Sequence, residues 1–518
     1  MRAPVLSCAL CLALLLPGAA LAQEDDRGYL TAFLEDNLSD AGRKITITGF
    51  EGALSSRATI TLLEIADDAG VWITLDGVVL DWSRSSLLSG EVVVNELSAE
   101  TITLARLPET AEDKTPSPEA TPFALPELPV SVEIGKVQAA RIVLGEPVLG
   151  EPVEGRLEAS LSLSGGDGNA ALVLERTDGP QSRIALDANY SNASGELALD
   201  LSAQEEADGI AARLLDLPGS PSLDLTVKGA GTLADFTADV RLATDGQERL
   251  AGPVTVALGG KGETQFSARL AGDLAPLFLP DYADFIGNRV ALDVTGSRWP
   301  TGGLVLDRLA VQTRALQLSG SARVAGDGLP DAFDLNVLIA GEDGRPILLP
   351  MGGGRTWLRR GEIALAFDAA TDSGWKGSAS LLGLETDGLR LGNARIAGSG
   401  RIARVAGRNT FGGTLEFDAT GIALADLAMQ KAVGPSLSGS TVLSFRQGSG
   451  ALALRQLELT GEDYGATGSL EIEGLESGLM TGGRITLTAE DLSRFGDLAG
   501  MDLGGSGRVV LDGDRKST

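Results

Sequence analysis

The chain has 518 residues, with 71 acidic and 42 basic side chains, a formal net charge of −29 and no histidine. The lack of histidine excludes Ser/His/Asp triads, Cys/His dyads and imidazole ligands for zinc or haem. An acidic excess of this size repels the phosphates of nucleic acid, so we expect no nucleic-acid partner. Hydrophobic residues make up 43% of the chain and charged residues 22%, which is typical of a folded protein.

Residues 1–22 have the layout of a secretory signal. A basic residue precedes an apolar run, Pro17 interrupts that run, and the small residues Ala20 and Ala22 precede Gln23. We therefore expect cleavage between Ala22 and Gln23 and a protein that acts outside the cytoplasm. The alternative is an uncleaved membrane anchor, because about 20 uncharged residues approach the length that spans a bilayer.

Both cysteines, Cys8 and Cys11, lie inside this apolar run. After cleavage the chain would hold no sulfur nucleophile and no disulfide, and we expect no redox or metal role for the pair. Acidic pairs such as Glu205/Glu206 fall in predicted turns or polar segments, which favours solvated surface over paired catalytic acids. The sequence therefore predicts no catalytic residue, no metal site and no cofactor, and we do not expect an enzyme.

Residues 23–107 are predicted to form a helix followed by a β module. The helix is expected over 26–38, where apolar residues recur at helical spacing. Its apolar positions are Tyr29, Leu30, Phe33, Leu34 and Leu38. From Ile45 onward apolar and polar residues alternate in short segments separated by Gly, Asp, Asn and Ser. This period of two is typical of antiparallel β-strands joined by tight turns.

A proline-rich segment separates this module from the rest of the chain. Residues 108–129 contain six prolines among Glu, Thr and Asp, a composition that favours an extended, solvated linker over a central strand. The alternation then returns over 130–518, with turn signals roughly every 8–12 residues. We expect this region to be a repeated β-sheet. The last predicted strand runs into a polar terminus without a capping element, so we expect the natural protein to continue.

A looser recurrence runs through the long β region. A short helical segment opens on Asp-Leu and ends at a glycine before the next strand, over 273–287, 426–434 and 491–500. The spacings of 153 and 65 residues are unequal. A strict solenoid or propeller would repeat evenly, so we interpret this as irregular repetition of a sheet module with occasional helices.

Glycine-rich segments and two tryptophans have both structural and functional interpretations. The Gly-x-Gly-x-x-Ala segments at 229–234, 398–403 and 448–453 are expected to be hairpin turns, because strands follow them where a dinucleotide site needs a helix. A hairpin loop is also favoured over a calcium-binding repeat at 165–169, since the signature has no tandem copy.

Trp72 and Trp82 flank a predicted strand pair. Core packing is favoured there over a membrane-facing or groove-mouth role.

These patterns predict an all-β protein with an elongated, curled antiparallel sheet, an N-terminal signal or anchor helix and a few short helices. Each strand is apolar on one face, and a chain of this length cannot bury that face around one compact core. A trough that side chains leave unfilled suits acyl chains, which need no specific hydrogen bonds. The residues predicted to line it are Leu223, Leu225, Val227, Val254, Val256, Leu258, Val290, Leu292, Val294, Leu335, Val337, Ile363 and Leu365.

Four N-terminal segments carry a resemblance to a known family. They are GFEGALSS (49–56), IADDAGVWITL (65–75), VLDW (79–82) and LLSGEVVVNEL (87–97). Together they resemble the N-terminal region of the TamB family, AsmA-like subunits of the translocation and assembly module in bacteria with two membranes. The segment 272–296 is similar to the repeated β region of the same family.

The resemblance implies a curled β-sheet that bridges the periplasm and is anchored at the inner membrane by its N-terminus. It also implies phospholipids as cargo, an outer-membrane barrel of the TamA/BamA type as partner, and roles in outer-membrane biogenesis, lipid transport and protein secretion. The chain differs from the family in two respects. Its N-terminus looks cleavable, and the family's C-terminal domain, which contacts the barrel, is not found in this sequence.

Two other functions remain as alternatives. Exposed strand edges would allow the chain to act as a scaffold that templates outer-membrane proteins by β-augmentation, without carrying lipid. A membrane-spanning β-barrel would also contain alternating strands of about ten residues. Only 4% of the residues are aromatic, which is too few for two interfacial girdles, and the terminus around Lys516 is polar. The barrel is therefore the less favoured of the two.

Overall fold

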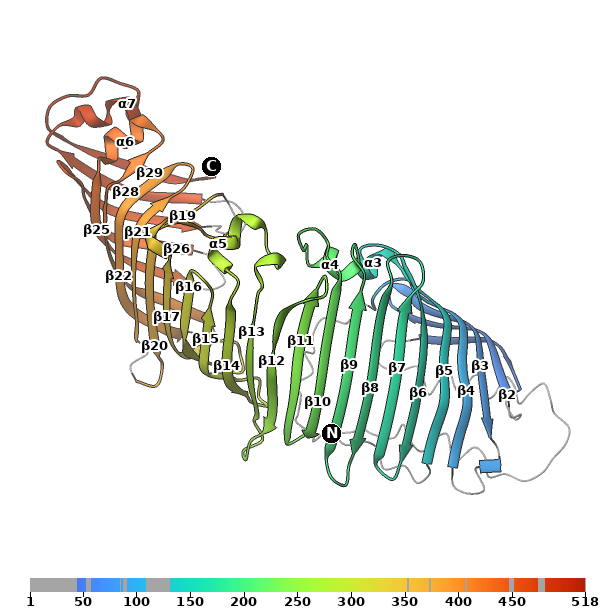
Figure 1. The fold of residues 1–518 in the computed structure, drawn as a ribbon. Coiled ribbons are helices and arrows are strands. Elements are labelled where there is room, and N and C mark those ends of the chain that lie inside the picture. Colours follow the sequence, from blue (N-terminus) through green and yellow to red (C-terminus); the bar gives the residue numbers. More distant parts are fainter. Residues whose placement is uncertain are drawn as a thin grey trace. The chain divides into compact units, whose positions relative to one another are not determined.

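The fold was analysed in a computed structural model, whose ribbon is drawn in Figure 1. The structure describes residues 44–52, 57–83, 85–86, 91–108, 131–351, 354–371, 374–405, 408–446, 451–473 and 480–517. The predicted signal, its cleavage site at Ala22/Gln23 and the helix at 26–38 lie outside these residues, as does 109–129 of the predicted linker. The chain divides into two compact units, unit 1 up to Gly259 and unit 2 from Gly260. Both consist of β-strands with a few short helices, which confirms the all-β class.

Unit 1 is a twelve-stranded sheet in which every strand pairs with its neighbours in the chain. Its strands are β1 (Lys44–Glu51), β2 (Arg57–Asp67), β3 (Gly70–Ser83), β4 (Glu91–Leu104), β5 (Ser131–Leu144), β6 (Val153–Ser164), β7 (Asp167–Arg176), β8 (Ser182–Ser191), β9 (Glu196–Glu205), β10 (Leu223–Thr232), β11 (Asp235–Thr244) and β12 (Gln247–Leu258). Two short helices, α3 (Glu146–Leu149) and α4 (Ile210–Leu214), connect strands. Figure 1 shows β4 to β12 side by side.

The expectation of a purely antiparallel sheet is wrong at one place in unit 1. Strands β4 and β5 run parallel, with Val94 opposite Ile134 and Leu97 opposite Val137. Parallel neighbours need a crossover connection of about a dozen residues or more, whereas antiparallel ones can be joined by a tight turn. The chain between β4 and β5 contains the proline-rich segment 108–129. This connection is long enough for β5 to run in the same direction as β4.

Among the described residues, unit 2 contains fourteen long strands and three two-residue strands, and the pairings between them are antiparallel. The long strands are β13 (Thr264–Gly272), β14 (Val290–Arg298), β15 (Leu304–Gln312), β16 (Leu316–Val324), β17 (Pro330–Ala340), β20 (Arg360–Asp368), β21 (Gly374–Glu385), β22 (Leu389–Val405), β23 (Arg408–Thr420), β25 (Ser436–Arg446), β26 (Ala451–Thr460), β27 (Tyr464–Glu473), β28 (Met480–Ala489) and β29 (Gly507–Ser517). The short ones are β18 (Ile347–Leu348), β19 (Trp357–Leu358) and β24 (Ala423–Leu424).

Helical turns interrupt unit 2 only between strands. They are η2 (Ala275–Leu277), η3 (Pro280–Tyr282), α5 (Ala283–Ile286), η4 (Glu342–Gly344), α6 (Leu427–Val433), η5 (Leu492–Phe495) and α7 (Gly496–Ala499). None of the helices in the described ranges is long and apolar enough to cross a bilayer.

These helical connections recur after every fourth long strand, so the recurrence is more regular than the sequence suggested. They follow β5 and β9 in unit 1, and β13, β17, β23 and β28 in unit 2. Their first helices begin at Glu146, Ile210, Ala275, Glu342, Leu427 and Leu492, which are 64, 65, 67, 85 and 65 residues apart. The long interval contains β22, a strand of 17 residues. The prediction of irregular repetition is therefore corrected to a four-strand module.

The position of these connections follows from strand direction. Successive strands alternate in direction after β5, so connections that are four strands apart leave from the same edge of a sheet. In unit 1 this edge carries α3 and α4. In unit 2 it carries α5, the β18–β19 hairpin, α6 and α7 (Figure 1). Each unit thus has one edge of tight turns and one edge with helical connections, which we call the helical edge.

The Asp-Leu and glycine signals mark the two ends of these connections, as predicted. Asp273, Asp426 and Asp491 each accept a hydrogen bond from a main-chain N–H two or three residues later, at 3.2, 2.9 and 2.9 Å. Gly287, Gly434 and Gly500 end the helices α5, α6 and α7 with φ of 67°, 79° and 65°. A short acidic side chain satisfies the free N–H groups of a first turn, and glycine adopts positive φ at no steric cost.

The glycine-rich motifs have different outcomes. The segment 165–169 lies at the β6–β7 hairpin, as predicted. The segment 229–234 ends in the β10–β11 turn, but its first four residues belong to β10, so the prediction is confirmed only in part. The segment 398–403 lies inside β22, so the hairpin prediction is wrong there. The motif at 448–453 begins outside the described residues.

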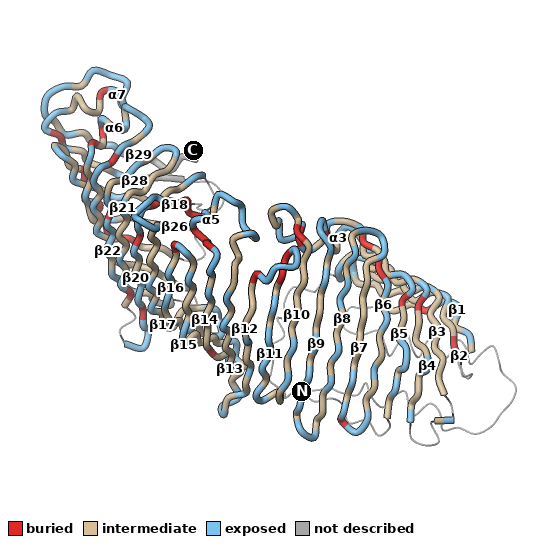
Figure 2. The backbone as a smooth tube through the Cα atoms, in the orientation of Figure 1, coloured by how far each residue is buried: buried red, intermediate tan, exposed pale blue. Residues whose placement is uncertain are grey.

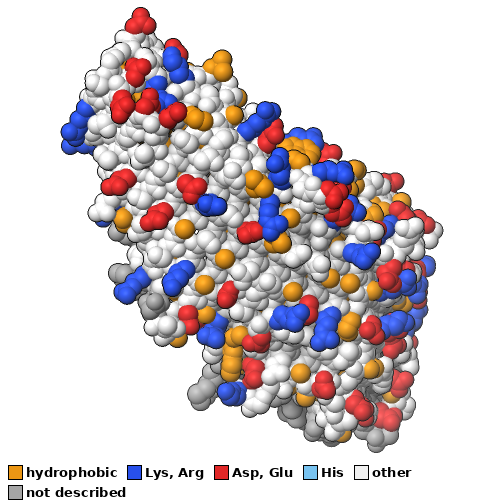
Figure 3. All heavy atoms as spheres, turned by 60° about the vertical axis from the view of Figure 1, so that its left-hand side comes forward, with side chains coloured by type: hydrophobic (Ala, Val, Ile, Leu, Met, Phe, Trp, Pro, Cys, Tyr) orange, Lys and Arg blue, Asp and Glu red, His pale blue; other side chains and the backbone are white. Residues whose placement is uncertain are grey.

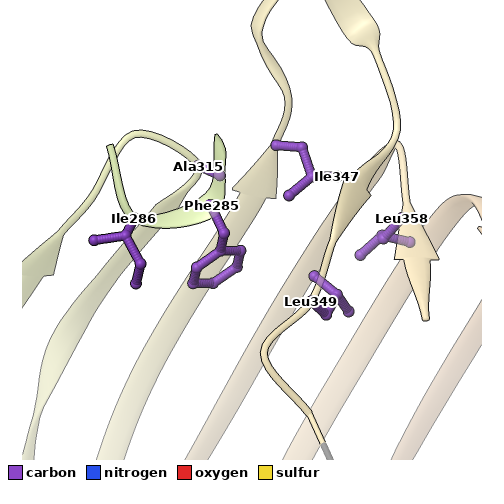
Figure 4. Packing of buried hydrophobic residues seen from close by; sticks show 6 residues of the cluster. All are labelled: Phe285, Ile286, Ala315, Ile347, Leu349 and Leu358. Atoms are coloured by element: carbon purple, nitrogen blue, oxygen red, sulfur yellow. The ribbon is translucent and has the colours of Figure 1, made fainter. Parts of the chain in front are cut away.

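Buried residues are few and occur in short stretches of the chain (Figure 2). The hydrophobic cluster of unit 2 lies where α5 meets the β18–β19 hairpin, and it comprises Phe285, Ile286, Ala315, Ile347, Leu349 and Leu358 (Figure 4). Sheet residues that pack against it include Val290, Leu316, Ile339 and Leu381. The cluster therefore forms a local second layer over the strand ends at the helical edge of unit 2.

Candidate functional site: the apolar face of the sheet

Strand register turns the alternating pattern into continuous apolar rows in unit 1. Residues that face each other across neighbouring strands share one face of a sheet, so a row of them forms a ladder across the unit. The first ladder crosses β4 to β11 and consists of Leu97, Val137, Ala159, Leu172, Leu186, Leu201, Val227 and Val240. The second crosses β5 to β12 and consists of Ala139, Leu157, Leu174, Ile184, Ala203, Leu225, Leu242 and Leu250.

Unit 2 has a ladder of the same kind across all its long strands. It consists of Leu270, Leu292, Val311, Leu318, Val337, Ile363, Ala379, Ile396, Phe417, Gly439, Leu459, Ala466, Leu487 and Val509. No charged or hydrogen-bonding side chain interrupts this row. We call the face that carries these ladders the apolar face of each unit.

All thirteen predicted lining residues lie on the apolar face of their own unit. Leu225 and Val227 belong to the ladders of unit 1, and Leu292, Val337 and Ile363 to the ladder of unit 2. The other eight alternate with these along the same strands or face apolar-face residues across a pair: Leu223, Val254, Val256, Leu258, Val290, Val294, Leu335 and Leu365. The structure thus places them on one face per unit, and their contact with lipid remains a prediction.

Large apolar side chains in the middle of this face remain exposed to solvent. Leu161 and Ile184 in unit 1 are each 41% exposed, and Leu365 and Ile396 in unit 2 are 40% and 43% exposed. A sheet with one apolar face normally buries it against another layer. Exposed large apolar side chains that recur along the ladders make this face the candidate for a binding surface.

The opposite face carries charged pairs between neighbouring strands. Arg156 and Arg183 both pair with Glu175, and Lys228 lies 2.9 Å from Asp200. Hydrogen bonds first from Arg156 and then from Arg183 hold the pKa of Glu175 below its usual value. Figure 3 shows one face of the molecule, across which acidic and basic side chains are scattered among neutral ones. The two faces of each sheet therefore differ sharply in polarity.

The hollows of the polar face do not carry the candidate site. A depression of about 490 Å³ in unit 2 is lined by small polar side chains that include Ser319, Asn336, Ser378 and Ser380. These positions alternate with the ladder residues and face away from them. Short Ser and Ala side chains between longer neighbours leave such hollows on any sheet, so we base the candidate site on the apolar face.

Glu205, a member of an acidic pair weighed as a catalytic candidate, has a structural role. The Glu205 carboxylate accepts hydrogen bonds from the main-chain N–H groups of Ile210 and Ala211, at 2.6 and 3.0 Å, and so caps α4. Within the described ranges, no group of three or more metal-ligating side chains is placed to hold an ion. One feature of the apolar face was not predicted from the sequence: the aromatic side chains around Trp375. Glycines inside a strand pattern are a signal of such close approach.

Comparison with protein-family models, with curated proteins and with solved structures finds no match to this chain. The function is therefore argued from the ladders, their exposure and the sequence signals alone. The resemblance to the TamB family remains a prediction.

Proposed function

We propose that this protein is a non-enzymatic, periplasm-spanning envelope protein that carries phospholipids along the apolar face of its β-sheets. The observation that carries the proposal is the pair of ladder systems with exposed residues such as Ile184 and Ile396. Burial of each apolar methylene stabilises a bound hydrocarbon chain by about 0.8 kcal/mol of transfer free energy. On a continuous ladder, the hydrocarbon chain can bury methylenes at every strand that it crosses.

A curled sheet is the second part of the proposal. An acyl chain on a flat apolar face leaves half of its own surface in water, whereas a concave face covers more of it. We therefore propose that each sheet forms an open trough with its ladders inward. The contrast between an ion-paired outer face and an apolar inner one supports this arrangement.

Localisation and partners complete the proposal. The secretory layout of residues 1–22 supports a periplasmic protein that is associated with or anchored to the inner membrane. The TamB-like segments support an outer-membrane barrel of the TamA/BamA type as partner. They also support a role in the assembly and secretion of outer-membrane proteins.

Site-specific photocrosslinking tests the lipid proposal. A photoreactive amino acid at Leu225 or Leu292 should form adducts with phospholipid in cells. The same probe at the adjacent residues Thr226 and Ala291, which face the other way, should form few or none. Equal lipid adducts at both members of each pair would overturn the proposal.

Charge substitution provides a second readout. Leu225→Asp and Leu292→Asp place an ion in the path of the acyl chains and should sharply lower the amount of lipid that copurifies. Thr226→Asp and Ala291→Asp are the matched controls and should leave it unchanged. Wild-type lipid content in folded apolar-face variants would contradict the proposal.

A β-augmentation scaffold is the alternative function. Among the described strands β29 pairs with β28 alone, and its residues Val510 and Leu511 are 54% and 58% exposed. An unpaired strand edge is a template for an added strand. Crosslinks from Arg508 to unfolded outer-membrane proteins, without lipid adducts at Leu292, would favour the scaffold over the lipid carrier.

A further inference from the structure

Aromatic side chains gather on the apolar face of unit 2, at the ends of β20 and β21 away from the helical edge. Phe333, Phe367 and Trp375 face one another across β17, β20 and β21. The rings of Phe333 and Phe367 have centroids 5.5 Å apart, and those of Trp375 and Phe411 are stacked with centroids 4.7 Å apart. We call these four residues the aromatic wall.

The Trp375 ring reaches across a whole strand to make its stack. Trp375 lies on β21 and Phe411 on β23, so the indole lies over the intervening strand β22. Its Nε1–H donates a hydrogen bond to the main-chain oxygen of Gly412, at 3.0 Å. The ring is therefore held in place by a polar bond as well as by stacking.

Glycines make room for the ring. A Cβ added at Gly413 would lie 2.5 Å from the indole, one at Gly400 would lie 2.7 Å from it, and one at Gly398 would lie 3.0 Å from it. Neighbouring atoms restrict the same positions, since a Cβ at Gly400 would lie 2.0 Å from the main-chain oxygen of Gly412 and one at Gly398 would lie 2.4 Å from Leu415 Cδ2. The ring and the adjacent strand together therefore favour glycine at these positions.

Two of the four wall residues are buried, whereas nearby residues of the same face are exposed. Phe367 and Trp375 are 5% and 7% exposed, whereas Leu365 and Ile396 are 40% and 43% exposed. Leu365 and Phe367 lie on the same face of β20, two residues apart. Exposure thus falls about eightfold within one step along the strand. The rings already cover one another, which leaves little surface for a ligand to bury.

We propose that the aromatic wall is a barrier that excludes acyl chains from this end of the strands and confines them to the ladder through Ile363 and Ile396. The inference rests on the proposed lipid function and assigns positioning residues within it. An acyl chain that entered the wall would have to separate two stacked rings and break the bond from Trp375 to Gly412. On the neighbouring ladder it covers exposed apolar surface without displacing anything.

Quenching of tryptophan fluorescence by brominated acyl chains tests the barrier. Two single-tryptophan proteins are needed, one that keeps Trp82 and one that keeps Trp375, with each of the other four tryptophans replaced by phenylalanine. Trp82 lies on the apolar face of unit 1, opposite Val94. Both full-length proteins are loaded with phosphatidylcholine that carries bromine along its acyl chains.

The barrier predicts that Trp82 is quenched at least threefold more strongly than Trp375. Equal quenching of the two would overturn the barrier while supporting the lipid proposal. Quenching of neither would overturn the lipid proposal itself, and the barrier with it. The two failures are therefore distinguishable in one experiment.

A second variant tests whether the wall itself provides the protection. Phe411→Ala in the Trp375-only protein removes the stacked ring and should raise Trp375 quenching to the level of Trp82. Phe236→Ala, an aromatic truncation on the apolar face of unit 1, is the control and should leave Trp375 quenching unchanged. Unchanged quenching in a folded Phe411→Ala protein would overturn the assignment.

Discussion

Units 1 and 2 carry the same apolar ladders but cover them differently. The buried apolar residues described in unit 1 are mostly alanines: Ile47, Ala58, Ala99, Ala139, Val153, Ala212, Ala238 and Ala243. Those of unit 2 include large side chains such as Phe285, Ile347, Leu349, Leu358 and Trp375. Ladders of aliphatic side chains thus leave many of them half-exposed. Large side chains are buried where a second layer or neighbouring aromatic rings cover them.

The second layer comes from the connections between strands. In unit 2, α5 and the β18–β19 hairpin fold onto the strand ends and bring Phe285 against Leu358 and its neighbours. In unit 1, the short helix α4 buries only Ala212. Unit 2 is thus partly stabilised by its own second layer, which the described residues of unit 1 do not provide to the same extent. Under the proposed function, bound lipid would therefore stabilise unit 1 more than unit 2.

The largest expected effect is on the second layer of unit 2. Phe285→Ala removes a ring that is 7% exposed, and large-to-small changes of this kind cost about 3–5 kcal/mol. The loss of stability should be measured as a lower free energy of unfolding in urea and as faster amide hydrogen exchange at residues 283–286. Leu279→Ala, at a position 58% exposed, is the control and should cost less than about 0.5 kcal/mol. Similar losses for both variants would contradict the importance of this layer.

If the protein carries lipid as proposed, removing the lipid should destabilise unit 1 more than unit 2. A ligand present at 100 times its dissociation constant stabilises the folded state by about 2.7 kcal/mol. We expect delipidation to increase amide exchange in β7 to β10 of unit 1 more than in the strands around the Phe285 cluster. An equal increase of amide exchange in both units would show that the second layer of unit 2 does not make it less dependent on lipid.

A smaller effect is expected at the helix caps. Asp426→Ala removes the acceptor for the Met429 N–H and should cost about 1 kcal/mol, seen as faster exchange in α6. Asp426→Asn keeps an oxygen acceptor and should restore most of the protection. If Asn and Ala behave alike, the hydrogen bond is not what stabilises the first turn.

The smallest effect concerns the ion pairs of the polar face. The pKa of Glu175 is lowered by its hydrogen bonds with Arg156 and Arg183, so the carboxylate stabilises the fold above its unfolded pKa of about 4.5. That contribution is lost as the pH falls through the lower, folded pKa. The urea midpoint of Glu175→Gln should therefore change less between pH 6 and pH 3 than that of the wild type. High salt should reduce the difference, because the pair is exposed.

Much of the fold follows from local signals in the sequence. The alternation around Leu225 and Leu292 predicted strands with one apolar face. The register confirms that Leu225 lies on the apolar face of unit 1 and Leu292 on that of unit 2. Asp426 and Gly434 predicted the start and end of a helix, since both signals act within a single turn. Local chemistry therefore sufficed wherever neighbours in the chain determine the structure.

Features that depend on distant residues were not predicted. The parallel pairing joins β4 to a strand that begins more than twenty residues after β4 ends, and Gly398 accommodates a tryptophan more than twenty residues earlier in the chain. The Phe285 cluster joins segments that lie about 60 residues apart. The periodicity of apolar residues does not predict contacts between such distant segments, because these contacts form only after the strands have paired.

Lipid analysis of the purified full-length chain tests the central claim most directly. The protein would be purified without detergent, extracted and analysed by mass spectrometry beside a soluble periplasmic protein as control. The account predicts several phospholipids per chain and none above background in the control. A monodisperse, folded chain without lipid would contradict it and leave the β-augmentation scaffold as the better-supported function.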